Sequence, residues 1–227
     1  HWSPDWTAGA AILSEFGSLQ MEFRKLSALT GDTIFDKKAT RAIEKIRKHC
    51  SSGFCPRNFR GENPVAGSPA GLGSFGDSFY EYLLKVWLMS DRHDPLFKGM
   101  WDKAAQHVLD TTTKVGEHYV PNGRETGNTM EHLACFSGGL FALSYINTGN
   151  KEHLELGERI ADTCHHMYTS SRTGLAPDVV QVHDSAKSPF TPVDNKYILR
   201  PETVETYFYL WRATHDEKYR DWGFAVL

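Results

Sequence analysis

Acidic residues stand at the starts of several apolar, aromatic-rich segments of this chain. The segment that begins at Pro201 carries Glu202 and Glu205 in its first turn, and another begins at Asp77 and carries Glu81. Paired carboxyl groups suit acid–base chemistry, because one protonated carboxyl can donate to a leaving oxygen while an ionised one activates water. Hydrolysis of a glycosidic bond has this requirement.

A structural explanation competes with the functional one. An acid in the first turn of a helix stabilises the helix dipole by about 0.3–1 kcal/mol and needs no function. His132 follows Glu131 at the start of a third apolar segment, and Glu15 and Glu22 align more loosely in a fourth. Several carboxylates in one desolvated cavity repel one another and raise some pKa values. We therefore favour a functional role for the group, although any one acid alone fits the structural explanation.

Four similar junctions predict the elements that position these acids. Each has an apolar segment, a small hydroxyl residue, an Asp or Asn, and then a charged amphipathic segment. Asp32, Asp91 and Asn150 recur at intervals of 59 residues (91 − 32 and 150 − 91), and Asp216 follows later. Such periods indicate a repeated supersecondary unit. Asp and Asn favour helix N-caps, and at the second junction Asp94 before Pro95 is an alternative cap.

The pattern predicts an all-α fold of four helix pairs with small β-hairpin or loop insertions between pairs. The first helices are apolar on every face, as expected of an inner layer, and the second are striped, as expected of an outer layer. Two such layers favour an (α/α) toroid or part of one, and a curved α-solenoid is the alternative. The expected helices are 12–30 with 32–49, 77–90 with 94–113, 131–147 with 151–169, and 202–214 with 216 onward.

Composition excludes several classes of protein. The chain has 227 residues, 40% apolar and 23% charged, with a formal net charge of −3 and no basic block, so we expect a globular protein that binds no nucleic acid. No apolar run reaches the roughly 18 residues that span a bilayer. Both ends look cut, and the chain is expected to be a piece of a longer protein. Cys50, Cys55, Cys135 and Cys164 do not form a zinc pattern, and their even number permits disulfides.

Several stretches resemble the class I α-1,2-mannosidases of glycoside hydrolase family 47, the Golgi type more than the ER type. They lie in family order over nearly the whole of residues 1–227, which would make the chain part of a single catalytic domain. The most specific are "GDSFYEYLLK" and "LRPETVETYFYLWR"; others are "SEFGSLQMEFRKLSALTGD", "MEHLACFSGGLFALS", "ELGERIADTCHHMY" and "GLAPDVV". The resemblance implies a barrel of seven helix pairs, of which about four are here, and inverting hydrolysis of terminal α-1,2-linked mannose from high-mannose N-linked oligosaccharides.

The resemblance also implies roles for individual residues. Asp77 matches a catalytic acid, and Glu202 matches the proposed general base for water. Asp178 matches a catalytic-site position where the family normally has Glu, a departure that puts its reach in doubt. Cys135 and Cys164 match the family's disulfide, while Cys50 and Cys55 match nothing. The residues that match the lining of the mannose pocket are Glu22, Glu81, His132, Phe136, Arg200, Glu205 and Phe208.

Two family stretches are expected outside this chain. The "FES-x-IR" stretch, with another catalytic Glu, should precede His1, and the "NTEAHP" stretch, whose Thr binds Ca²⁺, should follow Leu227. Calcium is therefore implied for the complete protein, with no residue of this chain expected to bind the ion directly, and the piece alone should be inactive. The resemblance further implies a monomeric catalytic domain in the Golgi or ER lumen, held by a type II membrane anchor.

Two other functions remain open from the sequence. A relative that recognises mannose in glycoprotein quality control, with weak or no cleavage, is mildly favoured by Asp178 and opposed by the intact Asp77 and Glu202. A helical-repeat scaffold that binds proteins would not need clustered acids.

Overall fold

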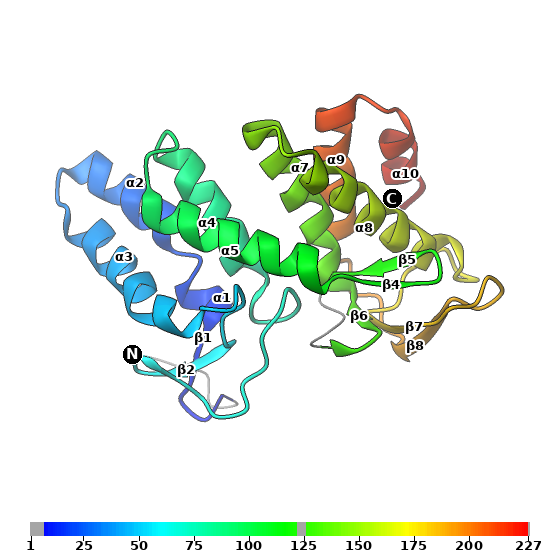
Figure 1. The fold of residues 1–227 in the computed structure, drawn as a ribbon, viewed down its shortest axis with the longest axis horizontal. Helices are drawn as coiled ribbons and strands as arrows, with labels where there is room; N and C mark the ends of the chain where they lie inside the picture. The colour runs from blue at the N-terminus through cyan, green and yellow to red at the C-terminus, as the bar shows by residue number, and fades with distance from the viewer. Residues whose placement is uncertain (1–6, 122–125, 227) are drawn as a thin grey trace. The chain divides into compact units, whose positions relative to one another are not determined.

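The computed structural model describes residues 7–121 and 126–226, and the chain divides into two compact units. One unit comprises the residues up to Gly71 together with Phe75–Val108, and the other comprises Leu72–Ser74 and the chain from Leu109 onward. Each unit is mostly helical, with short antiparallel strands (Figure 1).

The first unit holds two helix pairs and a small sheet. Helices α2 and α3 lie side by side as a hairpin, as do α4 and α5 (Figure 1). The sheet has the order β1-β2-β3, and Ala11 pairs with Phe59, which pairs in turn with Pro64. The elements are β1 (Ala11–Ile12), α1 (Leu13–Phe16), α2 (Gln20–Thr30), α3 (Ile34–Ile46), the 3₁₀ helix η2 (Arg47–His49), β2 (Asn58–Arg60), β3 (Asn63–Pro64), α4 (Asp77–Met89) and α5 (Pro95–Thr111), whose last turn belongs to the second unit.

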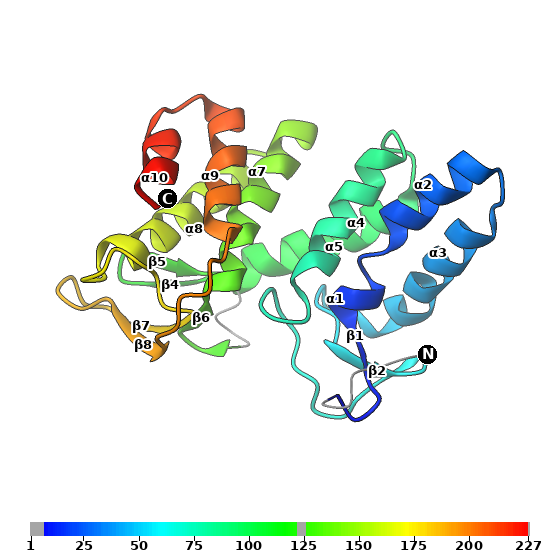
Figure 2. The same ribbon diagram turned by 180° about the vertical axis from the view of Figure 1, so that it is seen from behind.

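The second unit holds the other two helix pairs and two small sheets. Helices α7, α8 and α9 pack together, and the strands gather at one end of them (Figure 2). Strands β4 and β5 form a hairpin, and β6-β7-β8 form an antiparallel sheet. The elements are β4 (Thr113–Val115), β5 (His118–Val120), β6 (Thr129–Glu131), the 3₁₀ helix η3 (His132–Cys135), α7 (Phe136–Thr148), α8 (Lys151–Thr169), β7 (Val179–Val182), β8 (Phe190–Asp194), α9 (Glu202–Thr214) and α10 (Lys218–Val226).

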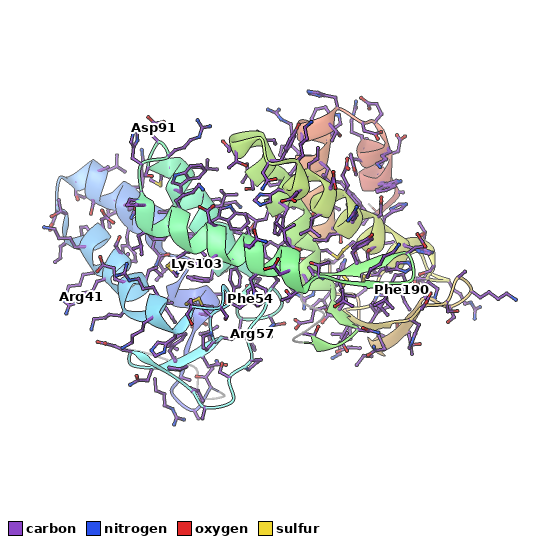
Figure 3. The ribbon with its side chains drawn as sticks, in the orientation of Figure 1. Arg41, Phe54, Arg57, Asp91, Lys103 and Phe190 are labelled. Carbon is purple, nitrogen blue, oxygen red and sulfur yellow. A yellow bond between two sulfur atoms is a disulfide. The ribbon has the colours of Figure 1, made fainter. Side chains whose placement is uncertain are left out.

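The predicted cap is confirmed at Asn150, whereas the N-cap position of α3 is Thr33, one residue after Asp32. The side-chain oxygens of Asp32, Asn150 and Asp216 each accept a hydrogen bond from the backbone N–H two residues on. At the second junction the cap is Asp94, whose Oδ1 accepts from the amides of Leu96 and Phe97. Asp91 lies instead in the turn between α4 and α5 (Figure 3), with a left-handed φ of 53°. Local side-chain chemistry therefore sets the start of every second helix.

Two of the expected first helices are wrong in detail. The helix expected over 12–30 is instead divided into α1 and α2 at Gly17, where a Cβ would stand 2.5 Å from both the Leu13 carbonyl oxygen and the Phe79 ring, so only glycine fits there. The helix expected over 131–147 begins later. Glu131 ends strand β6 and His132 opens the 3₁₀ helix, so neither lies in the first turn of an α-helix.

The predicted contrast between fully buried inner helices and outer helices with one buried stripe is found in part of the chain. Helix α7 is buried over Phe136–Ala142, and α8 buries a single stripe that includes Leu156, Ile160 and Cys164. Helices α2 and α9, expected to be inner helices, bury only one and four residues. A repeat needs neighbours on both sides to cover its apolar faces, which explains the exposure at these two helices. None of the described helices is long and apolar enough to cross a membrane.

Candidate active site

An ion pair between Arg200 and Asp178 marks the candidate site of the second unit. Arg200 lies two residues before α9, and Asp178 lies directly before β7. The guanidinium Nε donates to Asp178 Oδ1, and Nη2 donates to Oδ2 at 3.1 Å. Both side chains are largely buried, and their hydrogen bonds raise the pKa of Arg200 above its ordinary value. Both oxygens of the Asp178 carboxylate therefore accept from the guanidinium.

His132 lies in the core beside this pair. Its Nε2 is 2.8 Å from the Tyr168 hydroxyl and 3.1 Å from Thr203 Oγ1, and its backbone N–H donates to the Asp178 carbonyl at 2.8 Å. Burial, and then the positive charge of Arg200, lower the pKa of His132 to about 4, although Asp178 opposes the shift. The imidazole is consequently neutral at physiological pH, and a neutral ring offers one donor and one acceptor nitrogen.

Close backbone packing holds the surrounding elements in place. A Cβ at Gly138 would stand 2.6 Å from Thr206 Cγ2, so α7 and α9 approach closely there. Thr206 Oγ1 donates to the Cys135 carbonyl and accepts from the Gly139 amide, both at 2.6 Å. The disulfide between Cys135 and Cys164 joins η3 to α8, as the family resemblance implied. Closing this loop stabilises the fold by about 3–4 kcal/mol in the chain-entropy model.

The remaining predicted residues of this unit lie on α9 and α7. Glu202 and Glu205 occupy the first turn of α9 and are partly buried, and the Glu202 and Arg200 side chains are close enough for their charges to interact. Phe208 is 54% exposed, so its ring can meet a ligand. Phe136 is only 3% exposed and packs in the core, so it presents no free face to a sugar.

Sequence reasoning assigned no site role to three residues that build the site. Tyr168 and Thr203 fix His132, and Glu131 anchors the segment Leu72–Ser74, because its Oε2 accepts from the backbone N–H and the hydroxyl of Ser74 at 2.8 and 2.6 Å. One signal was available for Tyr168, which stands four residues after Cys164 and so shares its helix face. Thr203 directly follows Glu202, and this position alone carries no signal.

The other predicted residues lie in the first unit. Asp77 and Glu81 stand four residues apart at the start of α4 and share one face of the helix. Glu81 accepts from Lys85 Nζ at 3.1 Å, and Glu22 Oε1 accepts from the Tyr82 hydroxyl at 2.6 Å. Burial and the Glu22 carboxylate raise the pKa of Tyr82 to about 12. Convergence of these acids with those of α9 on one pocket stays a prediction.

Calcium has no evident cage within residues 7–121 and 126–226. No group of three or more His, Cys, Asp and Glu side chains there is arranged to hold a metal ion. The residues present therefore do not themselves fit a calcium site, and we derive no chemical step through calcium.

A second disulfide joins Cys50 and Cys55, for which the sequence suggested no role. It closes a loop with a sequence separation of five at the end of η2. The backbone N–H of Cys55 donates a hydrogen bond to the Tyr80 hydroxyl at 3.0 Å. This bridge shapes the turn between α3 and β2.

The chain is similar to proteins of a known family. The profile of Glycosyl hydrolase family 47 matches residues 2–227. The chain is 40% identical over 97% of its length to "Mannosyl-oligosaccharide alpha-1,2-mannosidase IA" of Drosophila melanogaster, and likewise 40% identical over 97% to "Mannosyl-oligosaccharide 1,2-alpha-mannosidase IB" of Homo sapiens. It spans only 35% and 36% of the length of these two relatives. The solved "alpha-1,2-mannosidase from Trichoderma reesei" shares the fold with a TM-score of 0.86 at 24% identity, covering 96% of this chain and 51% of that one.

Proposed function

Because this chain belongs to glycosyl hydrolase family 47, we propose that the complete protein removes terminal α-1,2-linked mannose from high-mannose N-linked oligosaccharides by inverting hydrolysis. The observation that carries the proposal is the 40% identity over 97% of the chain to relatives named mannosyl-oligosaccharide α-1,2-mannosidases. The carboxylates at the start of α9 support it, since this chemistry needs them. The chain then forms part of one catalytic domain.

Glu202 is the proposed general base in this mechanism. An inverting enzyme needs a water on the face of the sugar opposite the leaving oxygen, with acid and base about 6.5–9.5 Å apart. Glu202, alone or with Asp77, orients or deprotonates this water. The acid that protonates the leaving oxygen is either Asp77 or a Glu upstream of this chain. His132, held neutral by burial, can donate to or accept from a sugar hydroxyl without adding a charge.

Asp178 has a positioning role in this proposal, in place of proton transfer. Its two oxygens accept hydrogen bonds from Arg200 and so hold the guanidinium in place. The shorter side chain, compared with the family's usual Glu, thereby holds Arg200 near Glu202. We assign Glu22, Glu81, Glu205 and Phe208 to the lining of the mannose pocket.

The cellular setting is also part of the proposal. Two disulfides suit an oxidising compartment such as the lumen of the Golgi or the ER. We expect a monomeric catalytic domain with a type II anchor and Ca²⁺ held by residues outside this chain.

Substitution Glu202→Gln in the complete protein tests the assignment. The variant keeps the shape of the side chain and removes the base, so kcat for mannose release should fall at least about a hundredfold. Glu217→Gln on the exposed surface is the matched control and should leave kcat unchanged. Turnover close to that of the unaltered protein in Glu202→Gln would remove Glu202 from the mechanism.

A mannose-recognising relative with weak or no cleavage is the second candidate, favoured by the capture of Asp178 by Arg200. It predicts that the unaltered complete protein binds a high-mannose oligosaccharide and releases no free mannose. Measured release at a rate typical of an enzyme would exclude it.

A further inference from the structure

A second pocket lies in the same unit, outside the residues assigned above. Its volume is about 480 Å³, and it is an open pocket lined by the end of α8, the loop that follows α8, strand β8 and the segment that ends at Tyr197. Ligand pockets for small molecules span about 300–1,000 Å³, so this space can hold part of a ligand. Phe190, labelled in Figure 3, contributes to its wall from the β7–β8 hairpin.

The walls of this pocket are tied together without a ligand. In the loop after α8, Thr173 Oγ1 lies 3.0 Å from Ser171 Oγ and accepts from the Leu175 amide at 3.3 Å. The Asp178 amide donates to the Lys196 carbonyl at 2.9 Å and joins this loop to the segment after β8. Binding therefore would not have to order these segments first, which lowers its entropic cost.

The chemistry of the lining suits a neutral polyhydroxylated ligand. Pro177, Leu175 and Tyr197 supply apolar and aromatic surface, and Asn195 and the loop hydroxyls supply donors and acceptors. Among the described residues that line the pocket, Arg172 alone is charged, and none carries a carboxylate. A sugar ring has this character, because its C–H faces are apolar and its rim carries hydroxyls.

The pocket adjoins the candidate active site on two sides. Pro177 directly precedes Asp178, and the Tyr197 ring lies 6.4 Å from the His132 ring and 6.3 Å from the Tyr168 ring, centroid to centroid. A ligand that extends from the site around Glu202 and His132 would therefore find this pocket beside it.

We propose that this pocket is an accessory sugar-binding site that holds a second, uncleaved part of the same neutral oligosaccharide. The identity of the sugar rests on the function proposed above, whereas the neutral polyol character rests on the lining itself. The pocket raises the affinity for branched oligosaccharides and takes no part in bond cleavage.

Substitution Leu175→Asp in the complete protein tests the proposal. Leu175 is 41% exposed, so the variant should fold, and its carboxylate would place a charge where the wall is apolar. We expect KM for a branched high-mannose oligosaccharide to rise about tenfold with kcat unchanged, since losing one such contact has an effect of this size. Kinetics on α-1,2-mannobiose, too short to reach both sites, should not change. Val193→Asp is the matched control, because Val193 is an exposed apolar residue of strand β8 in the same unit and does not line the pocket.

Two outcomes separate this proposal from the proposed function. Suppose that the unaltered protein releases mannose. If Leu175→Asp leaves KM unchanged for both substrates, or changes KM by the same factor for both, the accessory site is refuted and the proposed function stands. If no mannose is released from either substrate, the proposed function fails, and calorimetric titration of the oligosaccharide then decides the pocket. Binding weakened in Leu175→Asp and kept in Val193→Asp supports the site; equal binding in all three proteins refutes it.

Discussion

Lowering the pH from 7 to 4 should remove about 3 kcal/mol of folding stability through His132 alone. The ring is 1% exposed and hydrogen-bonds Tyr168 and Thr203, and its pKa in the folded protein is about 4 against an ordinary value of 6.5. The unfolded chain therefore takes up a proton as the pH falls below 6.5, and the folded protein does not until the pH approaches 4. Stability is fully present above pH 6.5 and is lost across this window.

The magnitude follows from the size of the shift. A difference of 2.5 units, from 6.5 to about 4, corresponds to about 3.4 kcal/mol at 1.36 kcal/mol per unit. Burial is the main cause, and the Arg200 charge adds to it. Substitution Arg200→Met should consequently raise the pKa of His132, because it removes the second cause.

The free energy of unfolding in denaturant, measured from pH 7 to pH 4, is the assay. The unaltered protein should lose about 3 kcal/mol more than His132→Gln over this range, because Gln cannot titrate. His183→Gln, at an exposed histidine of the same unit, should follow the unaltered protein. Parallel curves for the unaltered protein and His132→Gln, or a ring resonance of His132 that titrates near pH 6.5, would refute the reasoning.

Two further predictions concern stability. Gly138→Ala should lower the free energy of unfolding by about 1–3 kcal/mol, because the added methyl would stand 2.6 Å from Thr206 Cγ2. Gly99→Ala on α5, where the added Cβ meets nothing within 4 Å, should raise it by about 0.5–1 kcal/mol, and effects of the same sign would contradict the packing described. Replacing both Cys135 and Cys164 by Ser should cost about 3–4 kcal/mol, measured by denaturant unfolding without reductant. A midpoint equal to that of the unaltered protein would show that the bridge does not constrain the unfolded chain.

The helix starts and the repeated helix pairs could be predicted from the sequence, because they depend on residues that are neighbours in the chain. The side chains of Asp32, Asp94, Asn150 and Asp216 each accept from backbone amides two or three residues away, and such contacts do not need the rest of the fold. Family motifs likewise identified the bond between Cys135 and Cys164, which spacing alone left open.

The interruptions of the helices could not be predicted from the sequence, because they involve residues that are far apart in the chain. The first expected helix is interrupted at Gly17, where the ring of Phe79, 62 positions later in the sequence (79 − 17), packs closely. Cys50 and Cys55 looked isolated until the turn after η2 brought them together. Phe136 and Phe208 had equal claims to contact a sugar, and burial separated them.

The sequence by itself determined which residue types could do chemistry and that Glu202 and Glu205 begin a helix. Only the tertiary structure decided which partners those side chains meet. Asp178 and Arg200 stand 22 positions apart and pair because the β7–β8 hairpin folds back between them. The neutral state of His132 depends on burial by α8 and α9, whose residues lie 36 and 71 positions away. The burial of a side chain and the formation of an ion pair depend on distances in space, and the order of residues along the chain does not give those distances.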